Sequence, residues 1–176
     1  VDGMVISHVL GRGAPELVRF WGEPPLVREP EIALMGIERL DEPEQRFLSS
    51  SLLRRYPASE ISRKGASAAA EEALERVHGL QNEFVLHIDL DVIAAEDFAA
   101  TNLSAPGGMR WQEMEQSLAV LARQPKLAAL VISAYNPALD LDASAARRFI
   151  DLLAKTLAVR MAPPAEPAAA DHVTKA

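Results

Sequence analysis

The most constraining feature of this sequence is the apolar run FVLHIDLDVI at residues 84–93. Read with the two-residue period of a β-strand, it places Val85, His87, Asp89, Asp91 and Ile93 on one face, and the other face is entirely apolar. A strand that is largely apolar on both faces is typical of a parallel sheet covered by helices. We therefore predict an α/β fold, with this run as a central strand of a parallel sheet that has helices on both faces.

Two carboxylates stand side by side on the polar face of this predicted strand. Asp89 and Asp91 would lie about 7 Å apart along it. Like charges at the end of a buried strand cost several kcal/mol unless a cation or a proton compensates them. The pair therefore predicts a divalent metal site, and the alternative is that both residues are solvated or cap the following turn. His87 could be a ligand, a donor that orients a ligand, or a hydrogen-bonded core residue, and its position favours a neighbour over a ligand.

The remaining periodicities complete an alternation of strands and helices. We predict strands at 31–37, 56–60 and 127–133, and helices that begin at Asp41 and Ser67, at Trp111, and at Asp140 or Asp142. Ligands of parallel α/β folds gather at the carboxyl ends of the strands. The Asp89–Asp91 pair and the break at Asn136-Pro137 should therefore meet at the same rim, and the long loop 94–109 is predicted to bind a ligand.

Composition excludes several classes of protein. The chain has 176 residues and a formal net charge of −7, and it has no basic stripe with interleaved aromatics, so nucleic acid is not an expected partner. It has no cysteine, no apolar run of membrane-spanning length and no visible signal peptide, which agrees with a cytoplasmic protein. We expect one domain at 1–160 and a disordered Pro/Ala-rich tail at 161–176. Because the opening residues read as mid-domain sequence, we also expect an amino-terminal portion to be missing.

Several segments together resemble the arginase/agmatinase (ureohydrolase) family, in its carboxyl-terminal part. The segment HIDLD at 87–91 resembles the family's late Asp-x-Asp metal motif, and SAPGGM at 104–109 resembles the loop that follows it. The segment from Gly36 to Glu44 is similar to the family's substrate-contacting region, and YNP at 135–137 also fits. None of these is specific alone, but their order and spacing are.

The resemblance implies a binuclear manganese hydrolase with a three-layer α/β/α fold, in which helices cover both faces of a parallel sheet. Asp89 and Asp91 would be Mn²⁺ ligands, and the ions would activate a water that attacks an electron-poor carbon. Asp41 and Glu44 would face the amino end of a small-molecule substrate, although Asp41 also suits a helix cap. The family's ring-shaped assemblies imply a homo-oligomer.

Departures from the family pattern concern the substrate and the remaining ligands. The family's histidine before Gly-Met is Asp2, and the glutamate that binds a guanidinium is Ala134. The upstream Asp-x-His-x-Asp ligands do not occur. We therefore expect an altered C–N substrate and an inactive chain when it is alone. Two alternatives are a non-catalytic relative that acts as a binding or structural subunit, and an Asp-x-Asp glycosyltransferase. Against the glycosyltransferase, this sequence has no cluster of basic residues near the Asp-x-Asp motif that could bind the phosphates of a nucleotide.

Overall fold

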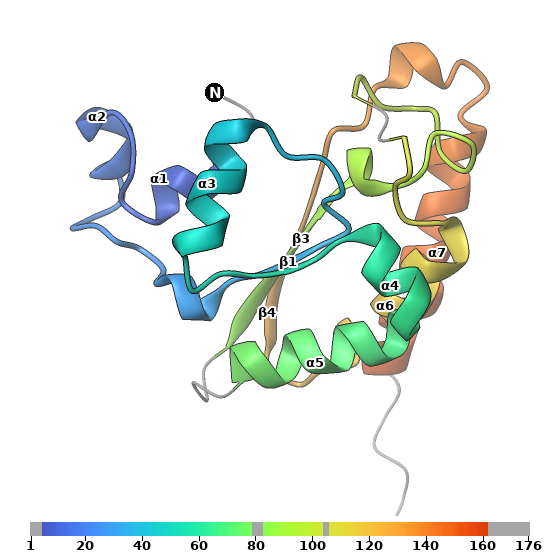
Figure 1. The fold of residues 1–176 in the computed structure, drawn as a ribbon. Coiled ribbons are helices and arrows are strands. Elements are labelled where there is room, and N and C mark those ends of the chain that lie inside the picture. The colour runs from blue at the N-terminus through green and yellow to red at the C-terminus, as the bar shows by residue number, and fades with distance from the viewer. Residues whose placement is uncertain (1–4, 79–82, 104–105, 162–176) are drawn as a thin grey trace, which may run out of the picture.

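The computed structural model describes residues 5–78, 83–103 and 106–161. The predicted disordered tail therefore lies, except for residue 161, outside the described residues. The described helices and strands alternate along much of the chain (Figure 1). They are α1 (Val5–Val9), α2 (Pro15–Val18), β1 (Ala33–Met35), α3 (Glu42–Ser50), β2 (Arg54–Tyr56), α4 (Ala58–Lys64), α5 (Ala66–His78), β3 (Phe84–Asp89), α6 (Trp111–Leu121), β4 (Leu127–Ser133) and α7 (Ser144–Met161).

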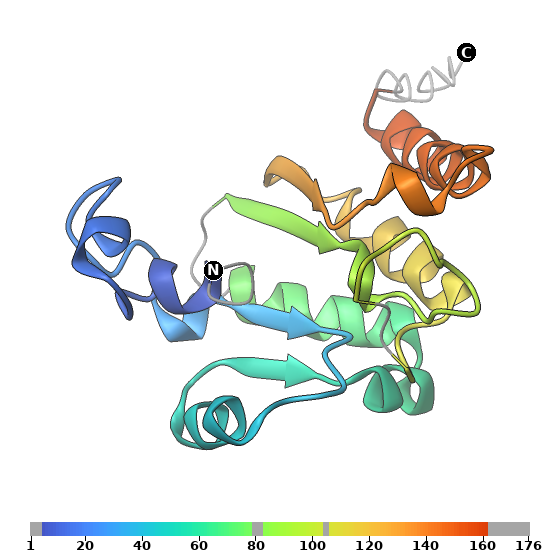
Figure 2. The ribbon, with the colours of Figure 1, turned by 90° about the horizontal axis from the view of Figure 1, so that it is seen from above.

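The strands form two parallel pairs. β1 pairs with β2, and β3 pairs with β4 in a register that sets Asp89 opposite Ser133. The arrows run in the same direction side by side, with β1 between β2 and β3 (Figure 2). Met35 of β1 and Leu86 of β3 pack against the same helical cluster, formed by Ala70, Leu74 and Leu121. The predicted parallel α/β fold is confirmed.

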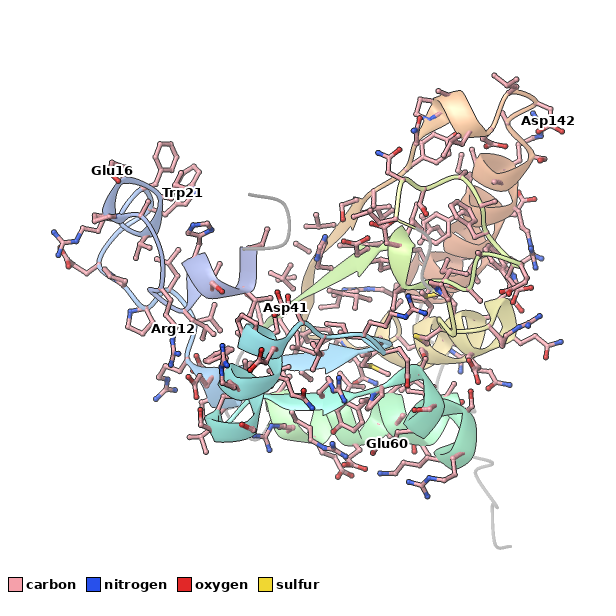
Figure 3. The ribbon with its side chains drawn as sticks, turned by 45° about the horizontal axis from the view of Figure 1, so that its top comes forward. Arg12, Glu16, Trp21, Asp41, Glu60 and Asp142 are labelled. Atoms are coloured by element: carbon pink, nitrogen blue, oxygen red, sulfur yellow. The ribbon has the colours of Figure 1, made fainter. Side chains whose placement is uncertain are left out.

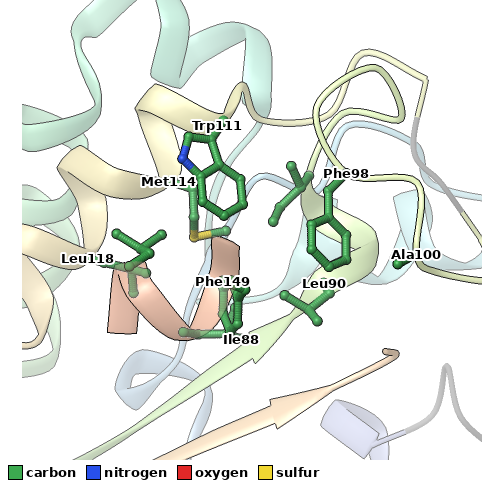
Figure 4. Close-up of a cluster of buried hydrophobic side chains, with 10 residues drawn as sticks. Ile88, Leu90, Phe98, Ala100, Trp111, Met114, Leu118 and Phe149 are labelled. Atoms are coloured by element: carbon green, nitrogen blue, oxygen red, sulfur yellow. The ribbon is translucent and has the colours of Figure 1, made fainter. Parts of the chain in front are cut away.

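The largest core cluster lies between β3 and the helices α6 and α7 (Figure 4). Three aromatic rings, those of Phe98, Trp111 and Phe149, pack with centroids 6.3–6.4 Å apart and are almost fully buried. Ile88 and Leu90 reach this cluster from β3 and the turn after it. The buried aromatics therefore fix the position of the strand end where the two aspartates lie.

The opposite face of the β3–β4 pair is exposed in the part of the chain that the structure describes. On this face Val85 is 62% exposed and Val131 is 47% exposed. His87 and Asp89 share this exposure. The sequence pattern suggested that both faces of this strand would be covered, whereas the packed helices contact only the face that carries Leu86 and Ile88.

Three predicted strand boundaries are wrong. The strand predicted at 84–93 ends at Asp89, and residues Leu90–Val92 form a short 3-10 helix. The strand predicted at 31–37 spans only Ala33–Met35, after a 3-10 turn at Glu29–Glu31. In place of the strand predicted at 56–60, the structure has β2 at Arg54–Tyr56, and α4 already begins at Ala58. The helix predicted from Ser67 is confirmed as α5, and its predicted last residues lie outside the described residues. None of the described helices combines the length and the apolar character needed to cross a membrane.

Candidate functional site

The two aspartates of the motif lie on different elements. Asp89 is the last residue of β3, and its Oδ1 accepts a hydrogen bond from the backbone N–H of Asp91 at 3.0 Å. This bond caps the 3-10 helix that carries Asp91. Placing Asp91 on the same strand face as Asp89 was therefore wrong, because capping by Asp89 ends the strand.

Both carboxylates nevertheless stay together at the carboxyl end of β3. Asp89 is exposed and Asp91 is half-buried. Oδ1 of Asp91 accepts from the backbone N–H of Leu103 at 3.3 Å, which ties the long loop to the motif. The second oxygen of each carboxylate accepts no hydrogen bond from the described residues. Each can therefore still contribute an oxygen ligand to a hard cation.

The loop after β3 is held closely against the motif by glycine. A methyl group at Gly108 would lie 2.6 Å from the carbonyl oxygen of Val92 and 2.9 Å from the backbone nitrogen of Ala94. Backbone hydrogen bonds join Ala94 and Val92 to Met109 in both directions, at 2.8 and 2.9 Å. The described end of the predicted ligand-binding loop, at residues 108–109, therefore lies against the residues that follow Asp91.

The predicted meeting of two loops at one rim is also present in the structure. Asn136, after β4, donates its backbone N–H to the carbonyl of Ala100 at 2.8 Å and its side-chain amide to Asn102 at 2.6 Å. Because β3 and β4 are parallel, these loops leave the sheet at the same edge. The rim thus contains the aspartate pair and both loops.

His87 is positioned by a residue that the sequence analysis missed. Its Nε2 lies 2.8 Å from Oγ of Ser133, the last residue of β4. Both belong to the exposed side of the strand pair, and no described contact joins the imidazole to either aspartate. The only available signal for Ser133 was a small polar residue ending an apolar run. His87 is therefore a neighbour of the aspartate motif, and its side chain is held by Ser133 of the adjacent strand.

Asp41 and Glu44 form a reciprocal cap at the start of α3, where Figure 3 labels Asp41. Oδ1 of Asp41 accepts from the backbone N–H of Glu44 at 2.8 Å, and Oε2 of Glu44 accepts from that of Asp41 at 2.9 Å. Among the described residues, no hydrogen bond or ion pair links them to Asp89 or Asp91. Capping accounts for one oxygen of each carboxylate and leaves the other free.

The turn after β4 departs from a strand at Ala134, whose φ of 69° lies in the left-handed region. Tyr135 follows, and its hydroxyl donates to Oδ2 of Asp140 at 2.9 Å. Asp140 also accepts from the backbone N–H groups of Ala145 and Ala146 at 3.0 and 2.8 Å. Burial alone would raise the pKa of Asp140, but these hydrogen bonds outweigh it and hold the pKa below its usual value. The hydroxyl of Tyr135 therefore binds the same carboxylate that accepts hydrogen bonds from the first turn of α7.

The described residues contain no group of three or more histidine, cysteine, aspartate or glutamate side chains arranged to hold a metal ion. Asp89 and Asp91 have the oxygen chemistry that Mn²⁺ prefers, but they are only two ligands. The residues present therefore fit part of a metal site, and further ligands are needed to complete it.

Comparisons with known proteins agree with this arrangement. The model of the Arginase family matches residues 3–159. The arginase of Bacillus caldovelox is 26% identical over 140 residues, which cover 80% of this chain and 47% of that protein. The 1.7 Å crystal structure of Bacillus subtilis arginase has a TM-score of 0.82 at 24% identity, covering 88% of this chain and 53% of the other.

A second group of similar structures has a different named activity. The formiminoglutamase of Trypanosoma cruzi, crystallised with Mn²⁺, has a TM-score of 0.66 at 16% identity, covering 77% of this chain and 47% of that one. This chain spans about half the length of the curated relatives it matches. At these identities the solved structures establish the fold alone.

Proposed function

Because this chain belongs to the arginase family, we propose that the protein containing it is a manganese-dependent hydrolase of a linear, non-peptide C–N bond. The observation that carries this proposal is the carboxylate pair Asp89–Asp91, which keeps two free oxygens at the carboxyl end of β3. Manganese in the similar formiminoglutamase structure supports the choice of metal. When bound, such a metal pair supplies a water acidic enough to act as a nucleophile near neutral pH.

This chain's own residues have distinct roles in the proposed site. Asp89 and Asp91 would each hold a metal through the free oxygen, while their bonded oxygens keep the 3-10 turn and Leu103 in place. His87 would support the site from β3, since Ser133 fixes Nε2 and leaves Nδ1 available for a hydrogen bond. The other metal ligands would come from residues beyond those described.

The proposed substrate is not a guanidinium compound. A buried guanidinium requires a carboxylate that accepts its paired N–H groups, worth about 1.5–3 kcal/mol per charged hydrogen bond. At the position where the family pattern has its guanidinium-binding glutamate, this chain has Ala134. The hydroxyl of the neighbouring Tyr135 already donates a hydrogen bond to Asp140. An amide or another non-guanidino C–N bond suits this position better. The free oxygens of Asp41 and Glu44 would remain available to a substrate amino group.

Metal analysis of the purified protein tests the proposed ligands. We expect bound Mn²⁺ in the wild-type protein and loss of tight binding in Asp89→Ala and Asp91→Ala. The control is Asp151→Ala, because Asp151 is exposed on α7 and has no hydrogen-bond or ion-pair partner among the described residues. Undiminished manganese in both motif variants would contradict the assignment. The 176 residues alone should bind Mn²⁺ only weakly and show no turnover, because two carboxylates cannot complete two coordination shells.

Urea release from arginine and agmatine tests the proposed substrate. The manganese-loaded protein should stay below about 10⁴ M⁻¹s⁻¹ in catalytic efficiency on both compounds. The variant Ala134→Glu restores a carboxylate at this position and should raise urea release. Efficient hydrolysis by the unchanged protein would show that another acidic residue binds the guanidinium.

A second candidate function is a non-catalytic family relative that acts as a binding or structural subunit. The absence of a third metal-binding side chain near Asp89 and Asp91, among the described residues, favours it. It predicts a protein that neither retains Mn²⁺ nor hydrolyses amides or guanidino compounds. Manganese retained with the stoichiometry of a metal pair would rule this alternative out.

A further inference from the structure

A hollow of about 800 Å³ lies between α3, β2 and the start of α4. Figure 3 labels Glu60, at its α4 side. Its lining includes charged side chains, among them Arg39, Arg54, Arg55 and Glu60, and apolar ones such as Leu48 and Leu53. None of these residues is Asp89, Asp91, Asp41 or Glu44. The hollow therefore contains none of the residues to which the proposed hydrolase function assigns a role, although Glu38 and Arg39 belong to the same segment as Asp41 and Glu44.

Both carboxylates of the hollow already have partners. Glu60 accepts from the guanidinium of Arg54 at 2.6 Å. Glu38 accepts from the backbone N–H of Ser59 at 3.0 Å and from its hydroxyl at 3.1 Å. Arg54 is also stacked over the ring of Tyr56, 4.4 Å from its centroid. Both carboxylates in the hollow are thus already hydrogen-bonded, Glu60 to Arg54 and Glu38 to Ser59.

Two guanidinium groups remain without partners. The guanidinium groups of Arg39 and Arg55 make no hydrogen bond, ion pair or ring contact with the described residues. Arg55 follows Arg54 in β2, so strand alternation directs it to the opposite face of the sheet from Arg54. Arg55 is half-buried, which makes an uncompensated charge there unfavourable. Both residues line the same hollow, so an anion bound there would compensate their charges.

The apolar part of the lining indicates what kind of anion fits. Leu48 and Leu53 line the hollow together with Gln45, so a ligand with a short hydrocarbon portion can bury that portion there. A guanidinium binds a carboxylate through two parallel N–H donors. We propose that this hollow binds a small organic acid, with its carboxylate groups held by Arg39 and Arg55.

Calorimetric titration of the purified protein with succinate tests this proposal, with inorganic phosphate as a second probe. The ionic strength is kept constant with chloride in both titrations. We expect one saturable site per chain for succinate, with a dissociation constant of about 1 mM or tighter, and weaker binding of phosphate. Arg39→Gln and Arg55→Gln should each weaken succinate binding about tenfold or more, while the manganese content stays unchanged.

Arg63→Gln provides the matched control, because Arg63 is exposed on α4, has no partner among the described residues and does not line the hollow. This variant should bind succinate as the wild-type protein does. The proposal is overturned if succinate does not saturate, if phosphate binds more tightly, or if the control loses as much affinity as the two hollow variants. Should Arg55→Gln fail to fold, Arg39→Gln decides the outcome, because Arg39 is exposed in a loop.

Discussion

Replacing Gly36 by alanine should disturb the structure that holds Asp91. Gly36 follows β1 with a φ of +80°, which costs a residue with a Cβ atom about 1–2 kcal/mol. A methyl group there would lie 2.2 Å from Cγ2 of Val92 and 2.8 Å from Sδ of Met109. Val92 is the residue after Asp91, in the short 3-10 helix. The substitution therefore adds a steric overlap to the backbone cost.

The expected loss in the free energy of unfolding can be divided between these two causes. Overpacking typically costs about 1–3 kcal/mol, so Gly36→Ala should lose about 2–5 kcal/mol in total. Gly107→Ala is the matched control, because its φ is +76° and its nearest neighbour, Cγ of Glu38, would be 4.0 Å away. The control should lose only about 1–2 kcal/mol.

Urea unfolding followed by circular dichroism measures these differences, and a double-mutant cycle isolates the overlap. Adding Val92→Ala to Gly36→Ala should recover the part of the overlap cost that comes from Cγ2 of Val92, while the close contact with Sδ of Met109 remains. Equal losses for Gly36→Ala and Gly107→Ala, or additive effects in the cycle, would refute this account of the close approach.

Three other substitutions probe the core, a cap and a pH-dependent contact. Phe149→Ala should lose about 3–5 kcal/mol of unfolding free energy in urea titration, and Ile150→Ala, at an exposed position, less than about 0.5 kcal/mol. Asp41→Ala should cost about 1 kcal/mol in the same assay through the lost cap of α3; no measurable loss would mean that the cap contributes nothing. Because the pKa of Asp140 is lowered in the folded protein, its stabilisation is present above its unfolded pKa, near 4, and is lost as the pH falls below it. Urea midpoints at pH 7 and pH 3 should therefore differ less in Asp140→Asn than in the wild-type protein, while Asp151→Asn should behave as wild type.

Local patterns were sufficient to predict the main elements and the family. Helical spacing located α5, α6 and α7, because the residues of one helix face are only three or four positions apart. The apolar run at 84–93 identified a parallel strand, and the family match over residues 3–159 agrees with the predicted resemblance. The metal, the altered substrate, the homo-oligomer and the cytoplasmic location stay predictions.

The end of β3 was not predictable from periodicity. A two-residue alternation continues through Asp91, whereas in the structure the carboxylate of Asp89 accepts from the backbone of Asp91 and begins a 3-10 helix. Such a side-chain bond competes with strand pairing, and hydrophobic periodicity carries no information about it. The sequence could therefore name both aspartates but could not place them relative to each other.

The sequence by itself determined most of the helices and strands and which residues have metal-binding chemistry, because helix and strand periodicity and carboxylate chemistry are properties of short segments. Only the tertiary structure decided which distant residues meet. Ser133 reaches His87 across 46 residues through the register of β3 and β4. Glu60 pairs with Arg54, whereas the guanidinium of Arg55 has no partner among the described residues. Strand register and helix packing arise from contacts between segments far apart in the chain, so no local pattern specifies them.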